Sequence, residues 1–348
     1  MTTPPRVFTD ADADLSVLDG RTAAILGFGN QGSAQAQNLR DSGVTVIVGN
    51  RDDEYRERAA AAGFRPAGIA GAAAAGQVAL LLIPDEVQPQ VFREQVAPHL
   101  QAGDTLVVAS GYNWSFGLLD VPDGIDVVMV APRMIGEAVR ARYLAGEGYP
   151  CFVSVERDAT GNALGTALAV ARGIGGTTGG AVASSALEEA TLDLFSEQAI
   201  WPAIFDVLHT AYEVLHDAGF SDEAILYEMY LSAEPAEIFA RAATTGLIGQ
   251  LGVHSQTSQY GQLRALRALR ASPGALRERF ERVLREDIQS GAFAREWSRA
   301  YADADARLAR LRAEAAARPI AAAERAVMER ARSRAAARSR PDGGEDQR

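Results

Sequence analysis

The segment with the clearest capacity for chemistry is GFGNQG at residues 27–32, which ends an apolar run beginning at Ala23 and opens a helical stretch, AQAQNLRDSG. Glycines at this spacing allow a tight turn, a close approach of the backbone to a pyrophosphate and close packing of the helix on the strand. The start of the helix adds amide donors and a partial positive charge. Glycine-rich turns also occur without a ligand, so the position between strand and helix carries the argument. The motif predicts a dinucleotide site with contacts from Gly27, Phe28, Gly29, Asn30, Gln31 and Gly32.

The choice of cofactor should depend on the residues after the second strand-like run, at residues 44–49. Arg51 is suited to holding a ribose 2′-phosphate, whereas Asp52 and Asp53 repel a phosphate and accept hydrogen bonds from a free ribose diol. Both NADH and NADPH remain open, with a slight preference for NADH because several carboxylates surround one guanidinium. The predicted contacts here are Asn50, Arg51, Asp52 and Asp53.

These residues need a scaffold, and the pattern between Thr22 and about Glu156 predicts one. Short apolar runs alternate with amphipathic helical stretches, which is typical of a doubly wound parallel sheet covered on both faces. The strand-like runs are residues 23–28, 44–49, 78–83, 105–110 and 127–132. We therefore expect an α/β Rossmann domain.

After Ala163 the sequence becomes rich in Ala, Leu and Glu, strand-like runs disappear, and a helical pattern continues to about Arg332. We expect a flexible arm over residues 1–15, a Rossmann domain over 16–184, an all-α domain over 185–332 and a disordered tail over 333–348. A core of normal size is expected, because 47% of the residues are hydrophobic.

Composition excludes several classes of function. The 348 residues include 34 basic and 45 acidic side chains, a net charge of −11, so neither nucleic acid nor a membrane surface is an expected partner. A single cysteine, Cys151, excludes an intramolecular disulfide. The sequence contains no lysine, which excludes Schiff-base chemistry and a lysine base. No secretory or membrane-spanning segment is visible, so we expect a cytoplasmic protein.

Several strings, in the right order, make the chain resemble the ketol-acid reductoisomerase family in its short form. They are GFGNQGSAQAQNLRDSGVTVIVG, LLIPDEVQ, VMVAPRMIGEAVR, DLFSEQA and DIQSGAFAREW. The resemblance implies a Rossmann domain followed by a knotted, all-helical C-terminal domain. It also implies a homodimer whose interlocked helical domains share the active sites. Members of this family isomerise a 2-hydroxy-3-oxo acid and reduce the product with NAD(P)H, using a pair of Mg²⁺ ions, so a small-molecule substrate is expected.

The resemblance implies that Asp193, Glu197 and Glu228 are metal ligands and catalytic residues. Asp193 and Glu197 are four residues apart, which places them on one face of an α-helix. Ser232 stands where the family has a second glutamate after Glu228, and its neutral hydroxyl is a poorer ligand for Mg²⁺. We therefore expect one Mg²⁺ site, whereas the second is doubtful.

The chain also departs from the family at its acid–base positions. Ser110 replaces a histidine, and Arg133, a further catalytic candidate, replaces a lysine with a guanidinium that cannot shuttle a proton. Ser255 falls on the serine that binds the substrate carboxylate, and Ser232 is a second substrate candidate. The remaining cofactor contacts implied by the resemblance are Pro84, Asp85, Gln88, Ser110 and Gly136.

Three hypotheses about function follow. In the favoured one, the chain is a diverged NAD(P)H-dependent reductase of specialised biosynthesis that acts on a small 2-oxo acid, ketol acid or imine, with weakened two-metal isomerase chemistry. In the second, it is a fully active reductoisomerase of branched-chain amino-acid synthesis. In the third, it is a non-catalytic nucleotide-binding scaffold. The glycines of the nucleotide motif are all present and the changes cluster at metal and acid–base positions, which favours the first hypothesis.

Overall fold

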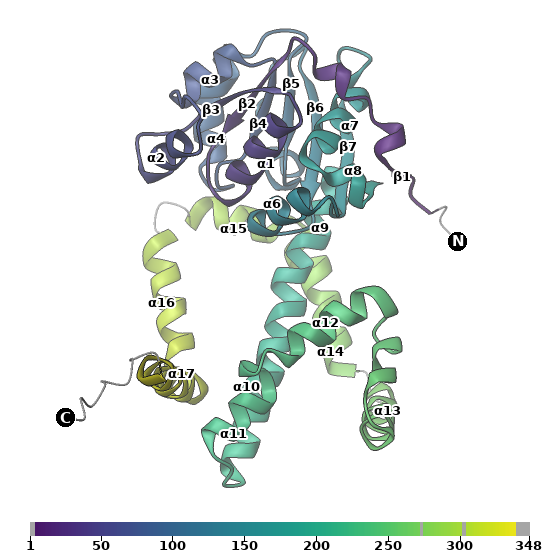
Figure 1. Cartoon of the computed structure of the whole chain (residues 1–348), viewed down its shortest axis with the longest axis vertical. Helices are drawn as coiled ribbons and strands as arrows, with labels where there is room; N and C mark the ends of the chain where they lie inside the picture. Colours follow the sequence, from purple (N-terminus) through teal and green to yellow (C-terminus); the bar gives the residue numbers. More distant parts are fainter. Residues whose placement is uncertain (1–3, 272–273, 301–303, 339–348) are drawn as a thin grey trace, which may run out of the picture. The chain divides into compact units, whose positions relative to one another are not determined.

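The computed structural model describes residues 4–271, 274–300 and 304–338 and divides into two compact units, Met1–Leu194 and Phe195–Arg348 (Figure 1). The expected domain boundary at residues 184 and 185 falls ten residues before this division. The difference arises because α9 (Ala186–Phe195) packs on unit 1, where Ala186 and Ala190 are buried.

Unit 1 is built on an eight-stranded sheet in the order β1-β8-β7-β6-β5-β4-β2-β3 (Figure 1). The five apolar runs predicted as strands form its parallel part, from β3 to β6. The strands are β1 (Val7–Phe8), β2 (Thr22–Leu26), β3 (Thr45–Gly49), β4 (Val78–Leu81), β5 (Thr105–Val108), β6 (Asp126–Pro132), β7 (Cys151–Arg157) and β8 (Ala181–Ala183).

The chain reverses its direction of travel across the sheet between β2 and β4. From β2 it moves outward to β3, where a single parallel bridge joins Gly49 to Ala67, and it then returns to β4 on the other side of β2. In open α/β sheets, ligands bind outside the carboxyl ends of the strands at such a reversal. The glycine-rich loop follows β2 directly, so the topology places it at this point.

Three strands lie outside the predicted parallel sheet. β7 pairs antiparallel with β6, β8 runs parallel to β7, and β1 closes the edge antiparallel to β8. The expected flexible arm over residues 1–15 is therefore wrong for Val7–Phe8 and for the short helices that follow, η1 (Asp10–Asp12) and η2 (Leu15–Leu18). Hydrogen bonds from Thr177 and Thr178 to Asp10 secure this segment.

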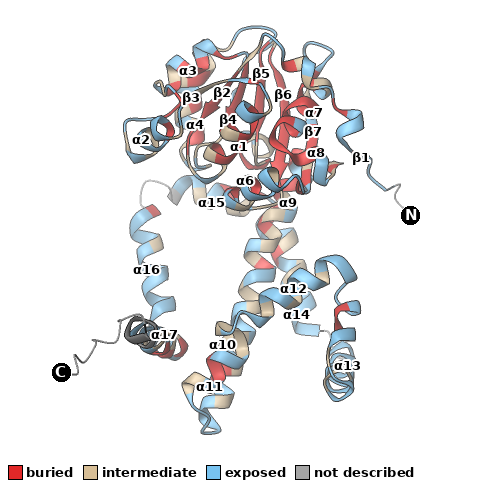
Figure 2. Cartoon of the chain, viewed as in Figure 1, coloured by how far each residue is buried: buried red, intermediate tan, exposed pale blue. Residues whose placement is uncertain are grey.

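Helices cover both faces of the sheet and enclose two separate apolar cores. The strands between these helices consist mainly of buried residues, drawn in red in Figure 2. Alternate residues of one strand enter different cores: Ile25 joins the core beneath α1 and α7, whereas Leu26 joins the core beneath α3. The helices of this unit are α1 (Asn30–Asp41), α2 (Glu54–Ala61), α3 (Ile69–Ala75), α4 (Gln88–Val91), η3 (Phe92–Val96), η4 (Ala97–His99), α5 (Tyr112–Ser115), α6 (Gly136–Ala145), α7 (Ala163–Ile174), α8 (Gly176–Gly179) and α9.

Among the described residues of unit 2, the regular secondary structure consists entirely of helices, as the sequence predicted. Its elements are η5 (Ser196–Ile200), α10 (Trp201–Asp217), α11 (Asp222–Leu226), η6 (Tyr227–Leu231), α12 (Glu234–Thr245), η7 (Gly249–Val253), α13 (Gln256–Arg270), α14 (Gly274–Arg282), η8 (Val283–Gln289), α15 (Ala292–Ala300), α16 (Ala304–Ala316) and α17 (Pro319–Arg338). Because α17 continues to Arg338, the expected disordered tail is wrong for residues 333–338, and residues 339–348 lie outside the described residues. Within the described ranges, no helix is both long and apolar enough to cross a bilayer.

Candidate functional site

The glycine-rich loop between β2 and α1 depends on a positive φ angle at one glycine and on a close backbone contact at another. Gly27 has a φ of +105°, and a Cβ on Gly32 would lie 1.9 Å from the carbonyl oxygen of Gly27. Gly29 is the N-cap residue of α1, and a Cβ there would meet no atom of the described residues within 4 Å. The loop thus leaves space beside the first amides of α1, which is the arrangement that binds a pyrophosphate.

The other residues of this loop are fixed by their neighbours. Phe28 is buried, and Gln31 donates a hydrogen bond of 2.7 Å to the carbonyl oxygen of Met134. Gly136, at the start of α6, packs so closely on Asn30 that a Cβ would lie 2.0 Å from the Asn30 carbonyl oxygen. The start of α6 therefore supports the loop from the side, which gives Gly136 a structural reason to be glycine.

Asn50 and Asp53 join the end of β3 to the glycine-rich loop and to α2. Asn50 accepts a hydrogen bond of 3.0 Å from the amide of Phe28 and donates one of 2.7 Å to Oδ1 of Asp53. Asp53 is the N-cap residue of α2 and accepts a hydrogen bond from the amide of Tyr55. Nε of Arg51 lies 2.5 Å from Oδ2 of Asp53, so both carboxylate oxygens have partners.

The electrostatics of this corner follow from those contacts. The hydrogen bond from Arg51 and the amides at the start of α2 hold the pKa of Asp53 below its ordinary value. The same ion pair raises the pKa of Arg51. Asp52, by contrast, is 97% exposed, and its Oδ1 lies 3.9 Å from Nη1 of Arg56.

A compact amide network lies after β4. Asn113 donates to the carbonyl oxygen of Asp85 at 2.9 Å and to Oε1 of Gln88 at 2.9 Å. The side-chain amide of Gln88 donates in turn to the carbonyl oxygen of Ile83 at 2.8 Å. The backbone amide of Gln88 donates to the carbonyl oxygen of Pro84 at 3.2 Å. Oδ1 of Asn113 is buried without a hydrogen-bond partner among the described residues. A buried acceptor of this kind is suited to an amide donor from a ligand.

A cavity of about 560 Å³ lies beside the first half of α1, between α1, α2 and α6. Its lining includes four predicted cofactor residues, Phe28, Gly29, Asn30 and Gly136, together with Arg58 and Arg140. Four of the predicted contacts are thus brought together around one space.

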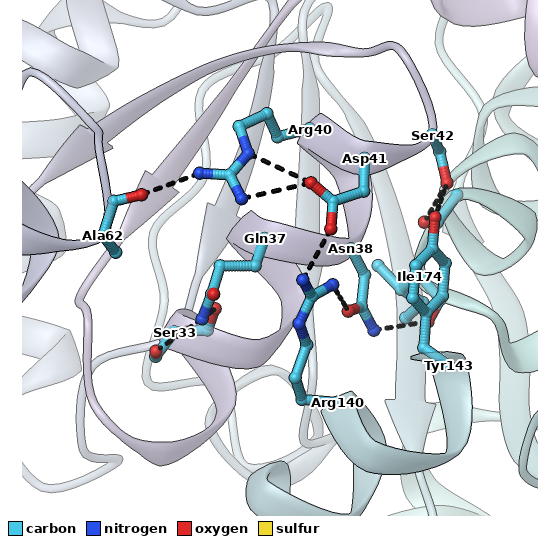
Figure 3. A network of polar contacts seen from close by, with 11 residues as sticks. Ser33, Gln37, Asn38, Arg40, Asp41, Ser42, Ala62, Arg140, Tyr143 and Ile174 are labelled. Atoms are coloured by element: carbon cyan, nitrogen blue, oxygen red, sulfur yellow. Dashed lines mark hydrogen bonds and ion pairs between the residues drawn. The ribbon is translucent and has the colours of Figure 1, made fainter. Parts of the chain in front are cut away.

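Arg140 belongs to a polar network that ties α1, α6 and α7 together (Figure 3). Its guanidinium donates to Oδ1 of Asn38 at 2.8 Å and to Oδ2 of Asp41 at 2.5 Å. Asn38 is fully buried and donates to the carbonyl oxygen of Ile174 at 2.9 Å. Ser42 and Tyr143 add a hydrogen bond of 2.7 Å between α1 and α6. The network fixes the helix whose start forms the proposed pyrophosphate site.

Arg133, directly after β6, bridges two carboxylates of α9. Its Nη1 lies 2.5 Å from Oε1 of Glu189, and its Nη2 lies 2.6 Å from Oδ1 of Asp193. The amide of Gly111 donates to Oε2 of Glu189 at 2.7 Å, so both oxygens of this buried carboxylate are bonded. The Arg133 guanidinium also lies 5.2 Å from the centre of the Phe152 ring. This cluster joins one positive and two negative charges.

Burial acts on the charges of this cluster. It raises the pKa of Glu189, and the hydrogen bond from Gly111 and the charge of Arg133 oppose that effect. Burial also lowers the pKa of Arg133, but the hydrogen bond with Asp193 and the charge of Glu189 outweigh it and raise the pKa overall. Nearby, burial raises the pKa of Tyr112 to about 12. The Ser110 hydroxyl accepts a weak hydrogen bond of 3.3 Å from the Tyr112 amide.

The predicted metal and substrate residues of unit 2 lie where helices change their geometry. Glu197 is in the π-helix η5, and Glu228 is in the π-helix η6. Asp193 lies in α9, which ends at Phe195, so the π-helix η5 begins between Asp193 and Glu197. The assumption that one continuous α-helical face carries both residues therefore does not hold. Ser232 ends η6 and accepts a weak hydrogen bond of 3.4 Å from the Glu234 amide. Ser255 is the N-cap residue of α13.

A break after η6 separates Glu228 from the acidic residues that follow. Ala233 has a φ of +67°, an unusual conformation for a residue with a side chain, and α12 begins at Glu234 with Pro235 in its first turn. Pro235 lacks an amide hydrogen, which is tolerated in this first turn of the new helix. Glu234 accordingly belongs to a different helix from Glu228.

Sequence reasoning missed three residues of these sites. Glu189 is four residues before Asp193, and this spacing of about one helical turn indicates a common face of the helix. Asn113 and Arg140 had no such pattern, because their roles depend on contacts with residues distant in sequence.

Comparison with known proteins identifies relatives over nearly the whole chain. Residues 17–180 match the family described as "Acetohydroxy acid isomeroreductase, NADPH-binding domain". Residues 187–332 match "Ketol-acid reductoisomerase, C-terminal domain". The first match ends just before β8, and the second begins at the second residue of α9.

Individual relatives agree with these matches. The chain is 39% identical over 320 residues to a ketol-acid reductoisomerase (NADP(+)) of Pyrobaculum aerophilum, covering 90% of this chain and 95% of the relative. It is 38% identical over 321 residues to the enzyme of the same name from Kocuria rhizophila, covering 90% and 92%. A solved structure of an NADH-preferring ketol-acid reductoisomerase from an uncultured archean has a TM-score of 0.86 at 30% identity, covering 93% of this chain and 98% of that one.

Proposed function

The chain belongs to the ketol-acid reductoisomerase family, and from this premise we propose that it is a reductase in which two-metal isomerisation is weakened. Family membership makes it an NAD(P)H-dependent enzyme that acts on a small molecule. We propose a small 2-oxo acid, ketol acid or imine as the substrate, in a specialised biosynthetic pathway. The observation that carries the proposal is the bridge from Arg133 to Glu189 and Asp193.

The residues of unit 1 fit a nicotinamide dinucleotide. The glycine-rich loop leaves space at the start of α1, and Asn113 presents a buried acceptor without a partner among the described residues. When bound, the nicotinamide supplies a hydride. The amides at the start of α1 would hold the pyrophosphate, and Oδ1 of Asn113 would accept a hydrogen bond from the cofactor. Asp85 and Gln88 hold the Asn113 side chain in place.

Arg133 stabilises the charge that develops on the substrate oxygen or nitrogen during reduction. A guanidinium has five N–H donors, and the bonds to Glu189 and Asp193 use two of them. Because a guanidinium stays protonated, Arg133 does not supply the proton that completes the reduction. Its contribution is a fixed positive charge held by two carboxylates and an aromatic ring.

The contacts around Asp193 do not fit a pair of Mg²⁺ ions. A carboxylate that bridges two cations uses both oxygens, whereas Oδ1 of Asp193 is paired with Arg133. Across the described residues, no three His, Cys, Asp or Glu side chains are grouped so as to hold a metal ion. We propose that Asp193, Glu197 and Glu228 are nevertheless the ligands of one Mg²⁺, although the described residues do not form this group in the structure without the ion, and we derive no step through a second ion.

We propose that NADH is the preferred cofactor. Arg51, the residue suited to a 2′-phosphate, is already paired with Asp53. A phosphate brought there would meet the Asp53 charge, while a ribose diol could donate to a carboxylate. Relatives named for NADP(+) and one described as NADH-preferring both exist, so the family admits either choice.

We also propose that the helical unit forms the knotted homodimer of the family. Its buried apolar cluster is small and centres on Tyr212, Leu226 and Val327. Many large apolar side chains remain exposed in unit 2 of the single chain, where Figure 2 is largely pale blue; they include Phe205, Phe239, Tyr260, Leu263 and Leu269. Such extensive apolar exposure is typical of a surface that is covered in the assembled protein.

The test offers two substrates to the purified protein, 2-acetolactate and its already isomerised 2-oxo-3-hydroxy acid. Oxidation of NADH and NADPH is followed with and without Mg²⁺. We expect turnover of the isomerised acid and little or none of 2-acetolactate. Equal turnover of 2-acetolactate and of the isomerised acid would contradict weakened isomerisation. It would establish the second candidate, a fully active reductoisomerase. The 39% identity to a named reductoisomerase favours that candidate.

If neither substrate reacts, other 2-oxo acids and imines are assayed in the same way. Cofactor binding is measured in parallel by the change in NADH fluorescence. Binding without reduction of any of these compounds would contradict the proposed activity and leave a nucleotide-binding scaffold.

A further inference from the structure

We propose that Arg133 is a resident cation of the active site, which competes with divalent metal for the carboxylate of Asp193. The inference rests on the proposed function in one respect, that Asp193 is the carboxylate facing the metal. Arg133 thereby sets how tightly metal binds, and the weakness of the metal site is a property of this one side chain.

The geometry gives Arg133 two carboxylate partners at once. Glu189 and Asp193 are one helical turn apart on α9, so their side chains lie on the same face, and the two Nη atoms of one guanidinium reach both. The fork of a guanidinium suits this bridging, whereas an ammonium group is a point charge. An arginine here therefore holds Asp193 in a way that a lysine paired with Glu189 would not.

The surroundings keep the guanidinium in place. Glu189 is only 1% exposed, and a buried carboxylate that lost its cationic partner would be strongly destabilised. The amide of Gly111 fixes the second oxygen of Glu189, and the Phe152 ring lies against Arg133. Arg133 is thus anchored through Glu189 whether or not Asp193 is engaged elsewhere.

Asp193 is the exchangeable partner. It is 41% exposed, in contrast to Glu189, so an ion from solvent can approach it. A divalent ion using Oδ1 would have to displace the hydrogen bond from Nη2 and would stand close to a positive charge that is present at every physiological pH. Both effects weaken metal binding at Asp193.

The experiment measures Mg²⁺ binding by titration calorimetry on the full-length protein without substrate or nucleotide. The variants are Arg133→Lys and Arg133→Gln, with Arg142→Gln as a control that removes a positive charge from an exposed pair with Glu147. We expect Arg133→Lys to tighten Mg²⁺ binding by about tenfold or more, within the range known for residues that contact metal ligands. Arg142→Gln should leave the affinity unchanged.

Two further outcomes decide the proposal. The gain in affinity must disappear in the double variant Arg133→Lys, Asp193→Asn, because the competition is for that carboxylate. The proposal would be overturned if the wild type and both Arg133 variants, each with a native circular dichroism spectrum, bound Mg²⁺ with equal affinity. A gain in Mg²⁺ affinity that persists in the presence of Asp193→Asn would also overturn it. The titration contains no substrate, so it remains decisive even if the proposed reductase activity is not found.

Discussion

Asp53 makes two kinds of interaction that a single substitution can separate. It caps α2 through the amides of Tyr55 and Arg56, and it binds Arg51 through its other oxygen. Serine is as good an N-cap as aspartate, but it carries no charge. Asp53→Ser should therefore preserve the helix while it frees Arg51.

The expected result of Asp53→Ser is a shift in cofactor preference towards NADPH. One charge-assisted hydrogen bond contributes about 1.5–3 kcal/mol, so the ratio of the Kd values for NADH and NADPH should change by about tenfold or more. The matched control is Asp52→Ser, which removes a charge from the exposed neighbour. Equal shifts in both variants would indicate a general effect of charge, and no shift in either would contradict the role of Arg51.

At the level of elements, the glycine-rich loop allows two functions of glycine to be distinguished. A Cβ at position 32 would collide with the carbonyl oxygen of Gly27, whereas Gly29 has an ordinary φ of −72° and space for a Cβ. Gly32→Ala should lower the free energy of unfolding by about 1–3 kcal/mol, the usual cost of overpacking. Gly29→Ala should leave stability nearly unchanged but weaken NADH binding by about tenfold, because the added methyl occupies the pyrophosphate space.

Urea unfolding and NADH titration of both variants check this separation. A Gly29→Ala protein that binds NADH normally would place the pyrophosphate elsewhere. A Gly32→Ala protein of unchanged stability would contradict the close contact within the loop.

The junction of α1 with α6 should be sensitive to acid. The hydrogen bond from Arg140 lowers the pKa of Asp41 in the folded protein. The stabilisation by Asp41 is therefore complete above the ordinary aspartate pKa of about 3.9 and is lost as the pH falls through the lowered folded value. Asp41→Asn should reduce the loss of stability between pH 5 and pH 3, measured by urea unfolding. An unchanged pH profile would mean that this ion pair does not contribute.

The elements differ in how far the sequence predicted them. β2 to β6 were visible because strands covered on both faces are continuously apolar. β8 has only three residues, Ala181–Ala183, and β1 has two, so their places depend on pairing with distant strands. The role of Glu189 was hidden for a similar reason: its spacing also fits a solvated helix face, and only the contact with Arg133, 56 residues away, distinguishes the two.

For the whole molecule, the exposed apolar residues of the helical unit predict association. We expect a particle of twice the 36.9 kDa chain mass in sedimentation experiments, because burying these side chains stabilises the assembled form. The midpoint of thermal unfolding should also rise with protein concentration if unfolding and dissociation are coupled. A monomer at all concentrations, with a constant midpoint, would contradict the proposed dimer.

The short strand β1 has a consequence for the behaviour of shortened chains. Val7 and Phe8 pair with Val182 and Ala181, and they occupy an edge that would otherwise present unpaired amide and carbonyl groups. Exposed strand edges recruit strands from other molecules. A protein lacking its first nine residues would keep every residue of the proposed site and yet be prone to aggregation by edge-to-edge pairing. Its loss from solution during purification would therefore reflect an uncovered sheet edge rather than a damaged active site.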